Sequence, residues 1–303
     1  MIQHAVTTVI DRDKCIGCGE CVRVCPSQTL EMKDGKALVT GVRSLACGHC
    51  AAVCPVEAVR VEALDPDSFR FHTFACRTDW MPWGAFDVGE LVRLMASRRS
   101  CRNFTGEPVP RPVLEDLVKI GTTAPSGTNS QGWTFTTLPS RAAVMKLGNA
   151  VGAFFKRINR MAENPLLRHG LRLIFRPELA GYYRDYHQSV AEGLADWEER
   201  GRDRLLHGAT AVIIVGSIPG GSCPAEDALL ATQNILLAAH TMGLGTCLIG
   251  FAVSAMQKDG RIKDLLKIPR EENVHAVIAL GHPAVTFQRL TGRKKAVSRF
   301  VEF

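Results

Sequence analysis

Residues 15–26 read CIGCGECVRVCP, and this stretch decides how the first part of the chain folds. The spacing C-x2-C-x2-C-x3-C-P surrounds an iron–sulfur cluster with thiolates, and it is formed here by Cys15, Cys18, Cys21, Cys25 and Pro26. Gly17 and Gly19 lie between these cysteines, and residues without a side chain let the backbone curl closely around a cluster. The stretch therefore predicts an iron–sulfur domain.

A second copy of the pattern follows after a shift of 29 residues. The shift superimposes the later members of the first run on Cys47, Cys50, Cys54 and Pro55. Repetition at a fixed period indicates an internal duplication. A disulfide framework suits a secreted chain and a zinc site needs four ligands, so both alternatives explain seven cysteines in register less well.

Roughly the first 60 residues resemble two-cluster bacterial ferredoxins, in which the fourth cysteine of each run binds the other cluster. The resemblance implies one [4Fe-4S] cluster held by Cys15, Cys18, Cys21 and Cys54. It also implies three ligands of a second cluster, namely Cys25, Cys47 and Cys50. The fourth position falls on Ser44, because the shift takes Cys15 to this residue.

Ser44 leaves the state of the second cluster open. A hydroxyl is a poorer iron ligand than a thiol because it gives up its proton far less readily. The cluster could be ligated by serine, completed by another group, reduced to three irons, or absent. Cys76 is a further conceivable ligand, although a lone cysteine is more often a small buried apolar residue.

The length and composition indicate a globular protein of two domains. The 303 residues contain no apolar run near the ~20 residues of a membrane span, so no membrane association is expected. Met1 to Lys14 lacks the pattern of a secretion signal, which favours a cytoplasmic location.

The formal net charge is +7, and the basic excess lies outside the cysteine-rich part. Residues 1–65 carry 7 basic and 8 acidic side chains, whereas the remainder carries 30 and 22. A basic surface suits an acidic protein partner or a phosphorylated ligand. No Lys/Arg tract is interleaved with aromatic residues, so nucleic acid is not an expected partner.

The remaining sequence divides into a linker, residues 66–86, and a second domain, residues 87–303. Helices are predicted from Asp87 to about Ser97, after Pro112 to about Gly121, and from Asp227 to Met242. Strands rich in β-branched residues are predicted over 134–138, 211–215 and 274–280. The interspersed elements, without a nucleotide-binding glycine motif, indicate an α+β domain after the ferredoxin-like one.

Four short segments of the second domain carry polar groups suited to one ligand. SRRSCRNF (97–104) offers a phosphate charge-assisted bonds from Arg98, Arg99, Ser100 and Arg102. APSGTNSQGW (124–133) bends the chain at Pro125, Ser126 and Gly127 and presents amides at Asn129 and Gln131. GLGTCLIGF (243–251) and GHPA (281–284) complete the set.

Together these segments resemble the nitroreductase family of flavoproteins over roughly residues 87–303. The resemblance implies FMN as cofactor, its phosphate bound by the basic cluster together with Arg293 and Lys295. It implies that Asn129 and Gln131 contact the polar edge and ribityl chain of the flavin. It also implies a homodimer and backbone contacts near the reactive flavin nitrogen from Leu248, Ile249 and Gly250.

The combination predicts an FMN-dependent oxidoreductase that takes single electrons from reduced ferredoxin or a similar donor. The clusters would pass them to FMN for two-electron reduction of a small nitro, quinone or enone acceptor. No catalytic residue is assigned, because the flavin itself carries the chemistry. An electron-transfer or redox-sensing protein without a small substrate is the alternative. Residues 155–204 are either amphipathic helices with solvated faces or a cover over the flavin.

Overall fold

The two cysteine runs fold into matching halves of a small N-terminal domain. The computed structural model describes residues 4–164 and 178–303. Three two-stranded antiparallel sheets pair β1 with β5, β2 with β6 and β3 with β4. In chain order the elements are β1 His4–Ala5, β2 Thr8–Ile10, α1 Glu20–Arg23, β3 Leu30–Lys33, β4 Lys36–Val39, β5 Arg43–Ser44, α2 His49–Ala52 and β6 Val59–Val61.

The two halves also share backbone conformation. Each short helix follows a left-handed glycine, Gly19 with φ of 76° before α1 and Gly48 with φ of 77° before α2. A Cβ atom on Gly17 would lie 2.1 Å from the carbonyl oxygen of Gly35, so a larger residue does not fit there. The duplication predicted from the cysteine spacing is therefore present in the structure, together with the close backbone approach expected of its glycines.

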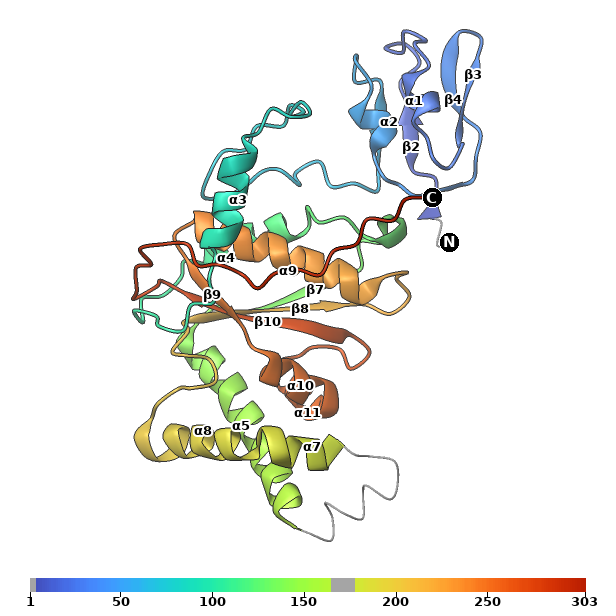
Figure 1. Cartoon of the computed structure of the whole chain (residues 1–303). Helices are drawn as coiled ribbons and strands as arrows, with labels where there is room; N and C mark the ends of the chain where they lie inside the picture. The colour runs from blue at the N-terminus through green and yellow to red at the C-terminus, as the bar shows by residue number, and fades with distance from the viewer. Residues whose placement is uncertain (1–3, 165–177) are drawn as a thin grey trace.

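An antiparallel four-stranded sheet in the order β7-β8-β10-β9 forms the centre of the second domain (Figure 1). Its strands are β7 Trp133–Leu138, β8 Ala211–Ser217, β9 Gly245–Leu248 and β10 Asn273–Gly281. The helices are α3 Val88–Ser97, α4 Arg111–Gly121, α5 Arg141–Glu163, α7 Glu178–Asp185, α8 His187–Arg200, α9 Pro224–Thr241, α10 Gly250–Lys258 and α11 Gly260–Leu265, with a short 3-10 turn η1 at Gly127–Asn129.

Helices cover both faces of the sheet. Ala211, Ile213 and Val215 of β8 belong to one core with α4 and α9. The alternate residues Val212 and Ile214 belong to a second core with α5 and α10. Every residue of β8 is buried and the strand is apolar up to the polar Ser217 at its end, so the expectation of a strand buried on both faces is confirmed.

The elements predicted from local patterns are present with small differences in their ends. Asp87 caps α3, its carboxylate accepting from the backbone N–H of Glu90 at 2.7 Å. Helix α9 begins at Pro224, three residues before the predicted start. Residues 155–204 contain the end of α5 and the helices α7 and α8, and residues 165–177 lie outside the described part. None of the helices in the described part combines the length and apolar character needed to cross a bilayer.

Residues 66–86 contain no helix or strand, yet they are attached to α4. The carboxylate of Asp116 accepts from the backbone N–H groups of His72 and Thr73 at 2.8 Å each and from the Thr73 hydroxyl at 2.6 Å. Lys119 donates to the carbonyl oxygens of Asp67 and Arg70. The connector is thus held against the second domain by groups of one helix.

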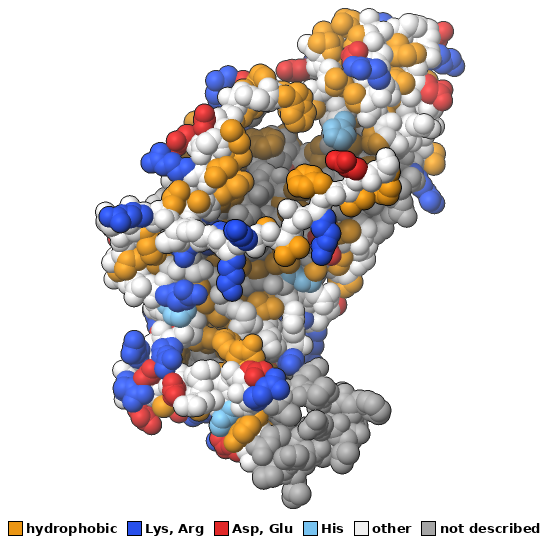
Figure 2. All heavy atoms as spheres, viewed as in Figure 1, with side chains coloured by type: hydrophobic (Ala, Val, Ile, Leu, Met, Phe, Trp, Pro, Cys, Tyr) orange, Lys and Arg blue, Asp and Glu red, His pale blue; other side chains and the backbone are white. Residues whose placement is uncertain are grey.

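The apolar face of α3 is largely exposed. Val88, Val92 and Met95 are 71%, 57% and 46% exposed. The C-terminal segment beyond β10 leaves further apolar side chains in solvent, among them Phe287, Leu290, Val297, Phe300 and Val301. Figure 2 shows apolar side chains along α3 with Lys and Arg side chains below them on the same face. A patch of this kind marks an interaction surface.

We expect Asp116→Asn to detach the linker. Burial would raise the pKa of Asp116, but the donors of His72 and Thr73 lower it overall. The change removes the charge that strengthens these hydrogen bonds, so the free energy of unfolding in urea at pH 7 should fall by roughly 1–3 kcal/mol. Because the folded pKa is depressed, this difference should begin to shrink as the pH falls below about 4, where the unfolded carboxyl is protonated, and should vanish only below the folded pKa.

Arg111→Gln is the matched control for this experiment. Arg111 lies on the same helix, is largely exposed, and pairs with Glu115 of that helix. An exposed ion pair contributes at most about 1 kcal/mol, so this variant should unfold close to wild type. Equal stability of Asp116→Asn and wild type at pH 7 would contradict the role assigned to the carboxylate.

Candidate functional site

Four cysteines of the N-terminal domain surround a small hollow. Apolar side chains such as Ala37 and Val59 complete its wall, and the cysteines are Cys15, Cys18, Cys21 and Cys54. These residues come from both halves of the duplication, in the crossed arrangement predicted for the first cluster. Four thiols around one apolar hollow fit the ligand requirement of a [4Fe-4S] cluster.

The second hollow of this domain is lined by three cysteines, Cys25, Cys47 and Cys50, and by Ser44. Ser44 is buried, and its Oγ accepts from the backbone N–H of Ala46 at 3.0 Å. The hydroxyl therefore stands where the duplication requires the fourth ligand. Cys76 is exposed in the linker and does not line this hollow.

Burial affects the corresponding cysteine of each hollow in the same way. It raises the pKa of Cys21 on α1 and of Cys50 on α2. Both groups therefore favour the thiol form in the protein alone, and iron binding displaces their protons. The two hollows thus have matched ligand positions despite the serine in the second.

A basic hollow of about 600 Å³ lies at one end of the sheet. It is lined by Arg98, Arg99, Ser100, Arg102, Asn103, Val285, Phe287 and Arg293. Burial lowers the pKa of Arg98, and the nearby charges of Arg293 and Arg99 lower it further. In the described residues none of these arginines forms an ion pair with a carboxylate, so the hollow fits an anionic group of more than one charge.

The predicted segment on β9 lies beside these arginines. Ser100 bridges to Thr246, and the backbone N–H of Cys101 donates to the carbonyl oxygen of Thr246 at 2.8 Å. Beyond this contact Leu248 and Gly250 are exposed, while Ile249 is buried. The structure therefore brings together the first, third and fourth predicted segments. Lys295 does not line the hollow.

The APSGTNSQGW segment lies elsewhere. The backbone N–H of Gly127 donates to Asp227 Oδ1 at 2.9 Å, and Trp133 Nε1 donates to the Asp227 carbonyl oxygen at 3.1 Å. Asp227 is at the start of α9, whereas His240, near its end, borders the region of Arg98. Thirteen residues of helix separate these points by roughly 20 Å. The loop also precedes β7, at the opposite edge of the sheet from β9.

Asn129 contacts the N-terminal domain in this structure. Its Nδ2 donates to the carbonyl oxygens of Leu45 at 3.0 Å and Ala46 at 3.1 Å, and its Oδ1 accepts from Gln131 Nε2. Within one chain, neither amide lines the basic hollow. Sequence analysis also missed Asp227 as the anchor of this loop, since its only local signal was a helix start.

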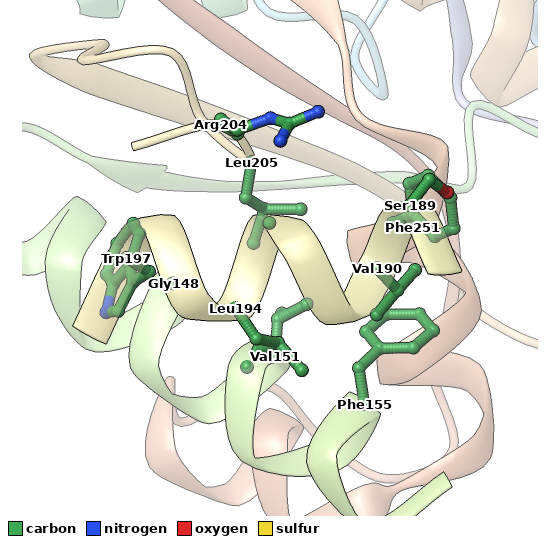
Figure 3. A pocket seen from close by; sticks show the side chains of 12 residues that line it. Gly148, Val151, Phe155, Ser189, Val190, Leu194, Trp197, Arg204, Leu205 and Phe251 are labelled. Carbon is green, nitrogen blue, oxygen red and sulfur yellow. The ribbon is translucent and has the colours of Figure 1, made fainter. Parts of the chain in front are cut away.

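An apolar hollow of about 230 Å³ lies between α5 and α8 (Figure 3). Val151, Phe155 and Leu194 line it, and Phe251 closes one end. Phe251 directly follows Gly250 of the predicted flavin segment and stands edge-on to Phe155, with ring centroids 5.4 Å apart. The hollow suits a small, largely apolar molecule.

Comparison with protein families fits this arrangement. Residues 95–282 match the nitroreductase family, and residues 8–61 match the 4Fe-4S dicluster domain. The chain belongs to the nitroreductase family. This nitroreductase-family member is an oxidoreductase with a ferredoxin domain at its N-terminal end, which confirms both the family and the cofactor classes predicted from the sequence. The assignment of individual ligand residues stays a prediction.

Individual relatives each match a part of the nitroreductase-family chain. Ferredoxin-2 of Desulfomicrobium norvegicum is 56% identical over 32 residues, 11% of this chain and 54% of the ferredoxin. Iodotyrosine deiodinase 1 of Rattus norvegicus is 44% identical over 46 residues, 15% of this chain and 16% of that protein. The chain thus spans about half of the first relative and a small part of the second. 4-nitrobenzoate reductase of a Nocardioides species is 26% identical over 216 residues, 65% and 80% of the two chains.

Solved structures show the same fold. A nitroreductase with bound FMN from Bacteroides fragilis has a TM-score of 0.51 at 21% identity, covering 70% of this chain and 99% of that one. Another with bound FMN, from Desulfitobacterium hafniense, has a TM-score of 0.51 at 22% identity, covering 70% and 98%. The predicted α+β fold is confirmed.

We expect Ser44→Ala to remove iron from the second hollow alone. Two complete [4Fe-4S] clusters give about eight irons per chain, and loss of one ligand should lower this count while the first cluster remains. Ser44→Cys should keep the full count and change the electron paramagnetic resonance signal of the reduced protein. Iron and sulfide assays on anaerobically purified protein provide the measurement.

Ser27→Ala serves as the control for the iron count. Ser27 lines the same hollow, but its Oγ accepts from the backbone N–H of Leu45. This variant should retain the wild-type iron content. A full count in Ser44→Ala would show that the serine oxygen is not a ligand.

Proposed function

We propose that the protein is an FMN-dependent oxidoreductase that receives single electrons through its clusters and delivers two electrons from FMN to a small organic acceptor. The contact of Asn129 with Leu45 and Ala46 carries this proposal. It joins the loop that resembles a flavin-binding segment to the backbone next to Cys47, a residue of the second cysteine hollow. This contact would place the flavin bound by the loop close to the second cluster.

The basic hollow fits the phosphate of FMN. Arg98, Arg102 and Arg293 supply charge without a carboxylate partner among the described residues, and Ser100 adds a hydroxyl. The exposed Leu248 and Gly250 beside them would lie along the flavin ring. FMN stores electrons and transfers hydride when bound, so this chain has to orient the cofactor and the acceptor. Solved relatives with bound FMN support the choice of cofactor.

A second copy of the chain would complete each flavin site. The basic hollow and the Pro125–Gln131 loop lie at opposite ends of α9 and at opposite edges of the sheet, so one chain cannot bring both to one flavin. In a twofold dimer the loop of one protomer can reach the hollow of the other. The exposed apolar faces of α3 and the C-terminal segment provide the surface for such a dimer.

The acceptor would bind in the apolar hollow between α5 and α8. Phe155 and Phe251 form its aromatic wall, next to the flavin segment in sequence. Arg204 is also at this hollow, but it is paired with Asp196 and Glu192, so it is not a free site for an anionic substrate. A small, uncharged, aromatic or unsaturated acceptor suits these walls, in keeping with a nitro, quinone or enone compound.

The donor would dock at the first cysteine hollow. Cys18 is exposed there, and Ile16 is 62% exposed. An exposed apolar residue beside a cluster ligand offers a contact for a redox protein. We therefore favour reduced ferredoxin, or a similar one-electron carrier, as the electron donor.

Arg102→Ala should weaken FMN binding roughly tenfold to a hundredfold, the effect of losing about 1.5–3 kcal/mol from a hydrogen bond to a charged group. Equilibrium dialysis against FMN gives the dissociation constant. Arg270→Ala is the control, because Arg270 is exposed, is paired with Asp264 and does not line the basic hollow. Unchanged affinity in Arg102→Ala would remove the phosphate assignment.

Gly193→Leu tests the acceptor site. Gly193 lines the apolar hollow, and a Cβ atom there meets no atom within 4 Å, so a leucine extends into the empty space. KM for a nitroaromatic acceptor should rise several-fold while FMN content stays unchanged. Gly181→Leu is the control, since its Cβ is equally unobstructed but the residue does not line the hollow. An unaltered KM in Gly193→Leu would place the acceptor elsewhere.

A further inference from the structure

The loop between Ala124 and Trp133 contacts the ferredoxin domain on one side and is exposed on the other. Asn129 turns inward and donates both amide hydrogens to Leu45 and Ala46 of its own ferredoxin domain. Pro125 and Gln131 remain exposed on the outer side. The backbone is fixed in this shape, because Asp227 binds the N–H of Gly127 and the Oγ of Ser130.

The contact of Asn129 with Leu45 and Ala46 places the loop beside the second of the two cysteine hollows. Ala46 lies between Ser44 and Cys47, which both line the second hollow. The first hollow contains neither residue and is the one with the exposed Cys18. Electrons that enter at the first hollow therefore reach the loop through the second. The serine-containing site is the one next to the flavin loop.

The exposed side of the same loop, with Pro125 and Gln131, is the side that can contact a flavin. We propose, resting on the function above, that the ferredoxin domain of one protomer reduces the FMN whose phosphate is bound by the basic hollow of the other protomer. Within one chain, the Ala124–Trp133 loop contacts the second cysteine hollow. The basic hollow of that same chain lies at the opposite end of α9 and at the opposite edge of the sheet, so it cannot share a flavin with this loop. Electron transfer consequently crosses the dimer interface.

The electron balance of this relay is simple. Two molecules of a reduced one-electron protein donor, each carrying an iron–sulfur cluster, are oxidised for each FMN. The FMN gains two electrons, and protons come from solvent. The clusters are reduced and reoxidised in turn and show no net change.

Mixed dimers provide the test. One chain carries Arg102→Ala and an intact ferredoxin domain, and the other carries Cys47→Ala with Cys50→Ala and an intact basic hollow. Two different affinity tags isolate the mixed dimer, and iron and FMN are counted. The flavin is then reduced anaerobically by a photoreduced ferredoxin that carries one cluster and one electron, supplied at two or more molecules per FMN, and its bleaching is followed in a single turnover.

We expect one FMN per mixed dimer, bleached at the wild-type rate, because its flavin is served by the intact clusters of the other chain. In the reverse arrangement all three changes are on one chain, paired with a wild-type chain. Its single FMN should then bleach as slowly as in a homodimer without the second cluster. Fast bleaching in the reverse dimer and slow bleaching in the first would overturn the proposal.

The wild-type homodimer separates this proposal from the proposed function. If its FMN bleaches no faster than that of the homodimer without the second cluster, the relay itself is wrong. If it bleaches faster, only the choice between the two flavins is being tested. This comparison is made before the mixed dimers are interpreted.

Asn129→Asp gives a second test that keeps every cysteine. Its carboxylate would face the carbonyl oxygens of Leu45 and Ala46, so the docking contact should open. Amide hydrogen exchange over residues 44–47 should accelerate at least several-fold in the holoenzyme, and flavin bleaching should slow. Asn234→Asp is the control, because Asn234 donates only to the Thr123 hydroxyl at the surface. Unchanged exchange and bleaching in Asn129→Asp would exclude the loop as the junction.

Discussion

The amide of Asn129 connects two folds that have no sheet or helix in common. Its two hydrogen bonds to Leu45 and Ala46 contribute about 1–3 kcal/mol together, too little to hold two domains alone. The linker supplies the rest of the attachment through Asp116 and Lys119. With one end held by the linker and the other by the loop, the ferredoxin domain is kept next to the position where its electrons are needed.

The sheet supports the proposal that the loop serves a different protomer. An antiparallel sheet of four strands separates its edge strands by about 14 Å, and α9 lies along one face. The loop before β7 and the turn after β9 therefore have the core of the domain between them. Val88, Val92 and Met95 of α3 are largely exposed, which makes them available for a second copy. In the proposed dimer, the same association would both cover the apolar face of α3 and complete the flavin site.

Local patterns predicted the helices α3, α4 and α9, the strands β7, β8 and β10, and the cysteine hollows, because caps, apolar alternation and ligand spacing act over a few residues. Asp87 and the β-branched run of β8 are examples. The direction of Asn129 was not predictable, since it depends on a contact across 84 residues of sequence. Strand β9 was read only as a motif because four residues starting with Gly245 give too short an alternation.

The apolar face of α3 shows a different limit of sequence reasoning. Helical periodicity identifies which residues share a face, but it does not say whether the covering surface belongs to the same chain. The four predicted flavin segments have the same ambiguity. Their order along the chain agrees with the family, and yet only three are in contact, through the bonds of Cys101 to Thr246 and of Ala284 to Asn103, while the APSGTNSQGW segment lies across the sheet. Sequence motifs can therefore predict a binding site without showing whether its residues come from one subunit or from two.

The single substitution in the duplicated cysteine pattern gains meaning from this geometry. The backbone N–H groups of Ala37 and Gly17 lower the pKa of the Cys15 thiol, whereas Ser44 Oγ accepts a hydrogen bond from the backbone N–H of Ala46. Ligand type and hydrogen bonds to the ligand atoms set the reduction potential of a cluster. Clusters bound in these two hollows would therefore differ in potential, although the backbone around them is nearly the same. Ser44, the position at which the two halves differ, lies beside the flavin loop. In the proposed relay, the cluster with the altered ligand is therefore the one that transfers electrons to the flavin.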